Sequence, residues 1–147
     1  MIYRIFNVGA LRQAHALGLR TILNTAPVPP DGIPPELFDV VDIMVANEHE
    51  AALITGLHVH DVDTAVDAGR ALVERGVGSA IITLGPLGAV WVDGTESGHV
   101  PAFPVTPVDT VAAGDAFCGV LAASLAQGRV WTDCIRRANA AGALATT

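Results

Sequence analysis

Residues 109–117, Asp-Thr-Val-Ala-Ala-Gly-Asp-Ala-Phe, place a carboxylate at the end of a run of small residues, where a helical pattern begins. Small side chains let backbone N–H groups approach an anion, and the first turn of a helix offers unpaired N–H donors at the positive end of its dipole. A carboxylate beside such a turn can accept a proton from an attacking alcohol. The pattern therefore predicts an anion-binding turn with Asp115 as general base. A plain helix start, in which Thr110 or Asp115 caps its own backbone amides, fits the same residues.

On both sides of this turn, helical and strand patterns alternate. Apolar residues at helical spacing predict helices over residues 8–17, 36–40, 48–55, 63–75, 113–127 and from Trp131 onward. Apolar runs predict strands over residues 19–23, 41–46 and 79–84, and a strand pair over residues 89–93 and 99–103. Five prolines within residues 24–35 predict a loop after the first strand. We expect an α/β fold of three layers, in which a largely parallel sheet has helices on both faces.

Composition narrows the class of protein. The chain has 147 residues, of which 51% are hydrophobic, and this is enough for one domain with its own core. No apolar run reaches the ~18 residues of a membrane span, and no signal-peptide pattern follows the first residue, so we expect a cytoplasmic protein without a membrane partner. A net charge of −7 argues against nucleic acid as a partner. Cys118 and Cys134 lack the spacing of metal ligands, which predicts free thiols.

Four segments resemble, in order and spacing, the motifs of the ribokinase-like (PfkB) carbohydrate kinases. The segment DTVAAGDAF is similar to the C-terminal signature of that family, DTxGAGDxF. ILNTAP at residues 22–27 resembles its strand and loop, ANEHEAALITG at residues 46–56 its NxxE motif, and ITLGPLG at residues 82–88 its nucleotide-phosphate loop. The resemblance implies the ribokinase-like fold.

The resemblance covers only the C-terminal portion of such a kinase. It implies that residues 1–147 form a single unit, the nucleotide-binding and catalytic half, truncated at both ends. The N-terminal sugar-binding half and its small β-lid, through which full-length relatives form homodimers, have no counterpart here. The final strand and helix of the family, which help to bind adenine and a monovalent cation, would follow residue 147.

Within the resemblance, the residues of the opening motif correspond to the catalytic turn. Asp115 matches the general base that takes the proton from the primary hydroxyl of the sugar. The N–H groups of Ala112, Ala113, Gly114 and Asp115 match the anion hole, which neutralises charge on the transferring phosphoryl group.

The remaining matches concern the nucleotide and its metal ions. Asn47 and Glu50 match the NxxE pair that organises Mg²⁺ and water around the phosphates; a helix N-cap with a solvated helix face is the alternative for this pair. The other matches are Thr83 and Gly85 beside the phosphates, Asn139 beside adenine, and Asp109 with the carbonyl of Val111 as ligands of a monovalent cation such as K⁺.

The resemblance implies an ATP-dependent phosphotransferase that uses Mg²⁺ and moves the γ-phosphate of ATP to the primary hydroxyl of a sugar. Within the family, the AAGD form of the signature is most similar to the ribokinases, which favours D-ribose as the substrate and ribose 5-phosphate as the product. Two alternatives remain open: an inactive fragment or nucleotide-binding module, and a kinase of the same family for another sugar or nucleoside. A nicotinamide-binding domain is disfavoured because no GxGxxG follows an early strand.

Overall fold

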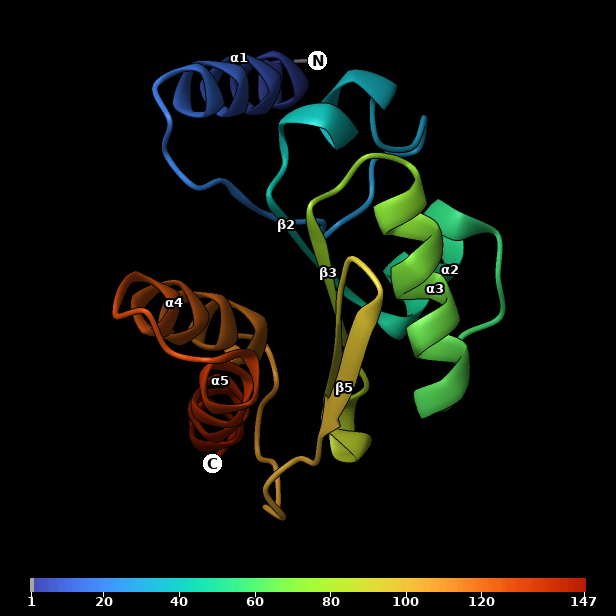
Figure 1. Cartoon of the computed structure of the whole chain (residues 1–147). Coiled ribbons are helices and arrows are strands. Elements are labelled where there is room, and N and C mark those ends of the chain that lie inside the picture. Colours follow the sequence, from blue (N-terminus) through green and yellow to red (C-terminus); the bar gives the residue numbers. More distant parts are fainter. Residues whose placement is uncertain (1) are drawn as a thin grey trace.

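A mixed five-stranded sheet forms the centre of the part of the chain that the computed structural model describes, residues 2–147, with side chains from residue 8 onward (Figure 1). The strands follow one another across the sheet in chain order: β1 (Ile22–Asn24), β2 (Ile43–Asn47), β3 (Ser79–Thr83), β4 (Ala89–Asp93) and β5 (Glu96–Val100). β1, β2 and β3 are parallel, and β4 and β5 form an antiparallel hairpin beside β3. The predicted α/β class is confirmed. The sheet is parallel only from β1 to β3, because the predicted strand pair joins the same sheet.

Helices cover both faces of this sheet. One face carries α2 (Glu48–Thr55) and α3 (Val62–Glu74), and the other carries α4 (Ala113–Ala126) and α5 (Trp131–Ala145) (Figure 1). α1 (Ile2–Ala16) packs beside η1 (Pro35–Val40), a 3₁₀ helix in the segment before β2. The three-layer arrangement expected from the sequence is therefore present in the described residues.

The alternation of side chains along β2 explains why both faces are buried. Met44 and Ala46 belong to the core that α2 and α3 cover, whereas Ile43 and Val45 belong to the core that α4 and α5 cover. Successive residues of a strand point to opposite faces, so a strand between two helical layers needs apolar residues at every position. The unbroken apolar run that predicted this strand is the result.

Several predicted boundaries differ from the structure: the first strand is Ile22–Asn24 rather than residues 19–23, and the first helix begins at Ile2 rather than at residue 8. The second strand of the predicted pair begins at Glu96 rather than at residue 99, because Gly94, at φ +57°, turns the chain so tightly that Asp93 pairs with Glu96. The predicted helix at residues 36–40 is the 3₁₀ helix η1. Within residues 2–147, none of the helices has both the length and the apolar character required to cross a bilayer.

Candidate active site

The carboxyl ends of β1, β2 and β3 lie at one edge of the sheet, and this edge gathers several of the predicted site residues. Asn47 ends β2 and Thr83 ends β3, and the strand register places these two residues opposite each other. The Thr83 hydroxyl lies 3.5 Å from the carbonyl oxygen of Ala46. In open parallel sheets, ligands bind outside the carboxyl ends of the strands, so this edge is the place to look for a site.

Asn47 and Glu50 form a reciprocal capping box at the start of α2. The Oδ1 atom of Asn47 accepts the backbone N–H of Glu50 at 2.8 Å, and Oε2 of Glu50 accepts the backbone N–H of Asn47 at 3.1 Å. The predicted N-cap is confirmed. The solvated helix face is wrong, because Glu50 is only 7% exposed. The site edge therefore holds a largely buried carboxylate.

The turn before α4 leaves backbone donors open. The amide of Ala113 donates to the carbonyl of Thr110 at 3.2 Å, but no acceptor among the described residues takes the amides of Ala112, Gly114 or Asp115. No side chain caps this helix, so the plain helix start, in which Thr110 or Asp115 satisfies these amides, is wrong. The carboxylate of Asp115 is exposed, and it makes no hydrogen bond or ion pair with residues 8–147, whose side chains the structure describes. A turn with three free N–H groups beside an unengaged carboxylate can bind an anion and accept a proton.

The thiol of Cys118 is influenced by the charges of two predicted site carboxylates, Asp115 and Glu50. Burial, and then the negative charges of Asp115 and of Glu50, raise the pKa of its thiol. Asp115 is on α4 and Glu50 is on α2, which cover opposite faces of the sheet, so negative charge from both helical layers acts on this thiol.

The turn after β3 includes the 3₁₀ helix η2 (Gly85–Leu87) and then Gly88, whose backbone lies close to the backbone at the end of β5. Gly85 has φ +51° with open space around it, whereas Gly88 has φ +98° and its Cα faces the chain after β5. A Cβ atom on Gly88 would lie 2.1 Å from the carbonyl oxygen of Val100. The ring nitrogen Nε2 of His99 is 2.6 Å from the carbonyl oxygen of Leu87. Backbone packing therefore holds this turn against β5.

The residues matched to adenine and to a monovalent cation are already engaged with the protein. The Nδ2 group of Asn139 donates to the carbonyl oxygens of Val100 at 3.0 Å and Pro101 at 3.1 Å. Oδ1 of Asp109 accepts the N–H of Val111 at 3.0 Å, and Val111 itself is 86% exposed. In this structure Asn139 ties α5 to the end of β5, and Asp109 shapes the turn before α4.

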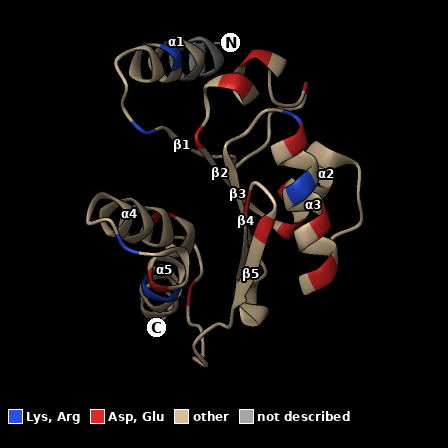
Figure 2. Ribbon diagram, viewed as in Figure 1, with Lys and Arg blue, Asp and Glu red and all other residues tan. Residues whose placement is uncertain are grey.

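Among residues 8–147, no arginine makes a hydrogen bond or ion pair with residues 109–117. All eight basic residues are arginines, and none lies between residues 76 and 128. Those in the described residues are spread over the helices and the segments next to them rather than gathered on one face (Figure 2). An anion at the start of α4 would therefore be bound by backbone N–H groups and the helix dipole.

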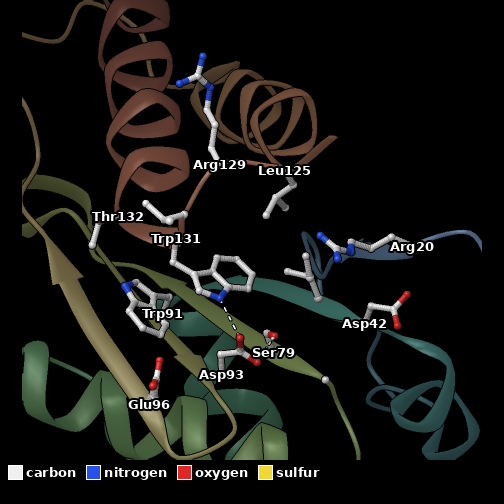
Figure 3. A pocket seen from close by; sticks show the side chains of 13 residues that line it. Arg20, Asp42, Ser79, Trp91, Asp93, Glu96, Leu125, Arg129, Trp131 and Thr132 are labelled. Carbon is white, nitrogen blue, oxygen red and sulfur yellow. Dashed lines mark hydrogen bonds between the residues drawn. The ribbon is translucent and has the colours of Figure 1, made fainter. Parts of the chain in front are cut away.

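A cavity of about 580 Å³ lies at the opposite edge of the sheet, beside the starts of β2 and β3 (Figure 3). Trp91 and Trp131 stack there with ring centroids 6.0 Å apart. Two of its three carboxylates are engaged by the protein: Asp42 accepts from Thr21, and Asp93 accepts from Ser79 and Trp131. The predicted site residues do not line this cavity, so it is separate from the candidate active site.

Thr25 is a member of this edge that the sequence did not single out. It lies in the predicted proline-rich loop, is 3% exposed, and donates its hydroxyl proton to Oε2 of Glu50 at 3.1 Å. A threonine in a loop is usually solvated, so only the strand register, which brings the end of β1 beside β2, reveals this contact.

Comparison with known proteins places the chain among sugar kinases. The model of the pfkB family of carbohydrate kinases matches residues 10–147. The chain is 36% identical over 118 residues to the ribokinase of Staphylococcus aureus (strain COL), covering 80% of this chain and 38% of that protein. It is 39% identical over 105 residues to the deoxyribokinase of Salmonella typhi, covering 71% of this chain and 34% of that protein.

A solved structure agrees with these relatives. The structure of Arabidopsis thaliana ribokinase complexed with ribose and ATP superposes with a TM-score of 0.89 at 27% identity, over 97% of this chain and 46% of that chain. The chain thus spans less than half the length of each of these three proteins.

Proposed function

The chain belongs to the pfkB family of carbohydrate kinases, and we propose that it contributes the ATP-binding and phosphoryl-transfer part of an enzyme that phosphorylates the primary hydroxyl of a sugar. The observation that carries the proposal is the start of α4, where three free backbone amides adjoin the unengaged carboxylate of Asp115. Phosphoryl transfer needs both parts at one point, because the anion must be held while the attacking hydroxyl loses its proton.

In the proposed reaction, the amides of Ala112, Gly114 and Asp115 hold the γ-phosphoryl group of ATP. The amide of Ala113, which matches the same anion hole, would join them only on leaving the carbonyl of Thr110. The sugar oxygen forms a bond to the γ-phosphorus as the bond from that phosphorus to the β,γ-bridging oxygen breaks. The proton of the hydroxyl passes to the carboxylate of Asp115, and ADP leaves with the electron pair of the broken bond.

The strand-end residues would hold the nucleotide. Thr83 and the turn at Gly85 would lie along its phosphates, and the Oδ1 atom of Asn139 would remain available to adenine. Glu50, buried and without an ion pair among the described residues, fits water bound to Mg²⁺, and Mg²⁺ bound with ATP would neutralise phosphate charge. Asp109 and the carbonyl oxygen of Val111 would be ligands of K⁺.

D-ribose is the substrate that we propose first, giving ribose 5-phosphate. The Staphylococcus relative is named a ribokinase and the Arabidopsis structure contains ribose. The name of the Salmonella relative makes deoxyribose the second candidate sugar. A nucleotide-binding module without turnover is the alternative for this chain by itself, since catalysis requires both substrates to be positioned together.

Turnover and binding measured on the same protein separate these possibilities. The chain is incubated with MgATP and either sugar while ADP and sugar phosphate are followed, and ATP binding is measured by calorimetry. Asp115→Asn should reduce turnover about 10²- to 10⁴-fold while retaining ATP binding. Asp63→Asn, which removes an exposed carboxylate from the first turn of α3, is the matched control and should leave both unchanged.

Each outcome has one meaning. Turnover that Asp115→Asn abolishes supports the kinase. ATP binding without turnover of either sugar supports the nucleotide-binding module. If the folded chain neither binds ATP nor phosphorylates either sugar, the proposed function is wrong.

A further inference from the structure

The carboxylate of Glu50 is held unequally at its two oxygens. Oε2 accepts two hydrogen bonds, from the backbone N–H of Asn47 and from the hydroxyl of Thr25, both at 3.1 Å. Oε1 accepts none from the described residues, and it is not among their fully buried atoms that lack a partner. One oxygen is therefore fixed by the protein, and the other is left for a ligand or for water.

Thr25 is built to hold this oxygen. Its backbone N–H donates to the carbonyl of Val45 at 3.0 Å, which continues the pairing of β1 with β2 and fixes the position of the residue. Its hydroxyl lies 3.1 Å from Oε2 of Glu50 and 3.3 Å from the carbonyl oxygen of Val45. A hydroxyl has only one proton to donate. Because the carbonyl oxygen of Val45 already accepts the backbone N–H of Thr25, the hydroxyl of Thr25 can donate its proton to Glu50.

The capping box alone does not fix the carboxylate. The bond from the N–H of Asn47 reaches the same oxygen as Thr25 does, and a single bond would leave the carboxylate able to rotate about it. Two donors from different elements, the start of α2 and the loop after β1, define its orientation. Thr25 and Glu50 are each more than nine-tenths buried as residues, so water competes little for these bonds.

We propose that Thr25 is a positioning residue, which orients the carboxylate of Glu50 so that Oε1 faces the metal side of a bound MgATP. This inference rests on the proposed function, because it assigns Thr25 a role only if the site binds MgATP. Groups that orient metal-associated ligands commonly change metal affinity when they are removed. The expected signature is therefore a defect in the part of ATP binding that depends on Mg²⁺.

The test compares Thr25→Val and Thr25→Ser in the full chain. Valine preserves the branched shape and removes the hydroxyl, whereas serine preserves the hydroxyl. The dissociation constant of ATP is measured by calorimetry with Mg²⁺ and with EDTA. We expect Thr25→Val to weaken binding about tenfold in Mg²⁺ and to leave binding in EDTA unchanged, while Thr25→Ser binds as the parent chain does. A general loss of structure would weaken both and would be visible by circular dichroism.

A double-variant comparison keeps the inference falsifiable if valine disturbs the loop. In the Glu50→Gln background, Thr25→Val should cause no further loss of Mg²⁺-dependent binding, because the group that it orients has lost its charge. An equal further loss in that background would overturn the positioning role. Mg²⁺-dependent binding that Thr25→Val leaves unchanged would also overturn it while the proposed function stands. Failure of the parent chain to bind ATP would overturn both.

Discussion

The contrast between Gly88→Ala and Gly85→Ala tests how the turn after β3 is held. Both glycines have positive φ, but a Cβ atom on Gly85 would enter open space. A Cβ atom on Gly88 would lie 2.1 Å from the carbonyl oxygen of Val100 and 2.6 Å from the backbone nitrogen of Ala102. These contacts are with backbone, which cannot rotate away as a side chain can.

The structure gives each substitution a magnitude. Gly85→Ala adds only the cost of a left-handed conformation, about 1–2 kcal/mol. Gly88→Ala adds about 1–3 kcal/mol of conformational strain and about 1–3 kcal/mol of overpacking. Its total of about 2–6 kcal/mol is a large part of the ~5–15 kcal/mol that stabilises an ordinary domain.

Urea unfolding of the two variants is the assay, with the fluorescence of Trp91 and Trp131 as the signal. The loss of unfolding free energy should be larger for Gly88→Ala, about 2–6 kcal/mol, than for Gly85→Ala, about 1–2 kcal/mol. Because about 1 kcal/mol corresponds to a melting-temperature shift of roughly 2–4 °C in a chain near this size, thermal unfolding should give the same order. Equal losses in the two variants would show that the close approach to β5 does not hold this turn.

Three further predictions follow from the same structure. Leu121 is fully buried between α4 and the sheet, so Leu121→Ala should lower the free energy of unfolding by about 2–5 kcal/mol in urea titrations; a loss below that range would mean that the core beneath α4 is looser than described. The charge of Asp115 raises the pKa of the Cys118 thiol, so Asp115→Asn should lower that pKa and shift the pH profile of alkylation by iodoacetamide to lower pH. An unchanged profile would show that the charge of Asp115 does not act on the thiol. Hydrogen bonds from Arg129 and from an arginine of α5 lower the pKa of Asp133, so the stabilisation that they give is present above the ordinary pKa of about 4 and is lost as pH falls through the lower folded-state pKa. Asp133→Asn should therefore remove part of the acid sensitivity of the melting temperature, and the same sensitivity in both proteins would contradict this.

Much of the fold was accessible from the sequence because the strong patterns are local. The cap at Asn47, the end of α2 at Thr55 and the helix beginning at Ala113 all depend on neighbours within a few residues. The hairpin boundary was missed because a two-residue turn at Gly94 and a longer loop use the same residue types. Local sequence patterns therefore predict which helices and strands form, whereas the residues at which a strand begins and ends depend on its pairing with other strands.

The site was accessible in part for the same reason. The open turn beside Asp115 follows from the small residues that precede it, and the resemblance to a family adds Asn47, Glu50 and Thr83. The contact from Thr25 to Glu50 could not be read from sequence, since 25 residues separate the two positions. The engagement of the Ala113 amide by Thr110 also depends on the conformation of one turn.

The capping box has a consequence for judging which relatives of this chain are active. Asn47 and Glu50 satisfy each other's backbone at the start of α2, so replacing either would destabilise the fold whether or not catalysis takes place. A descendant that had lost its activity would still be under pressure to retain both. Asp115 is exposed and makes no hydrogen bond or ion pair with the side chains and backbone of residues 8–147, so this part of the fold gives little reason to keep it. Among homologous sequences, the aspartate at the start of α4 should therefore distinguish working enzymes from silent copies, and the NxxE pair should not.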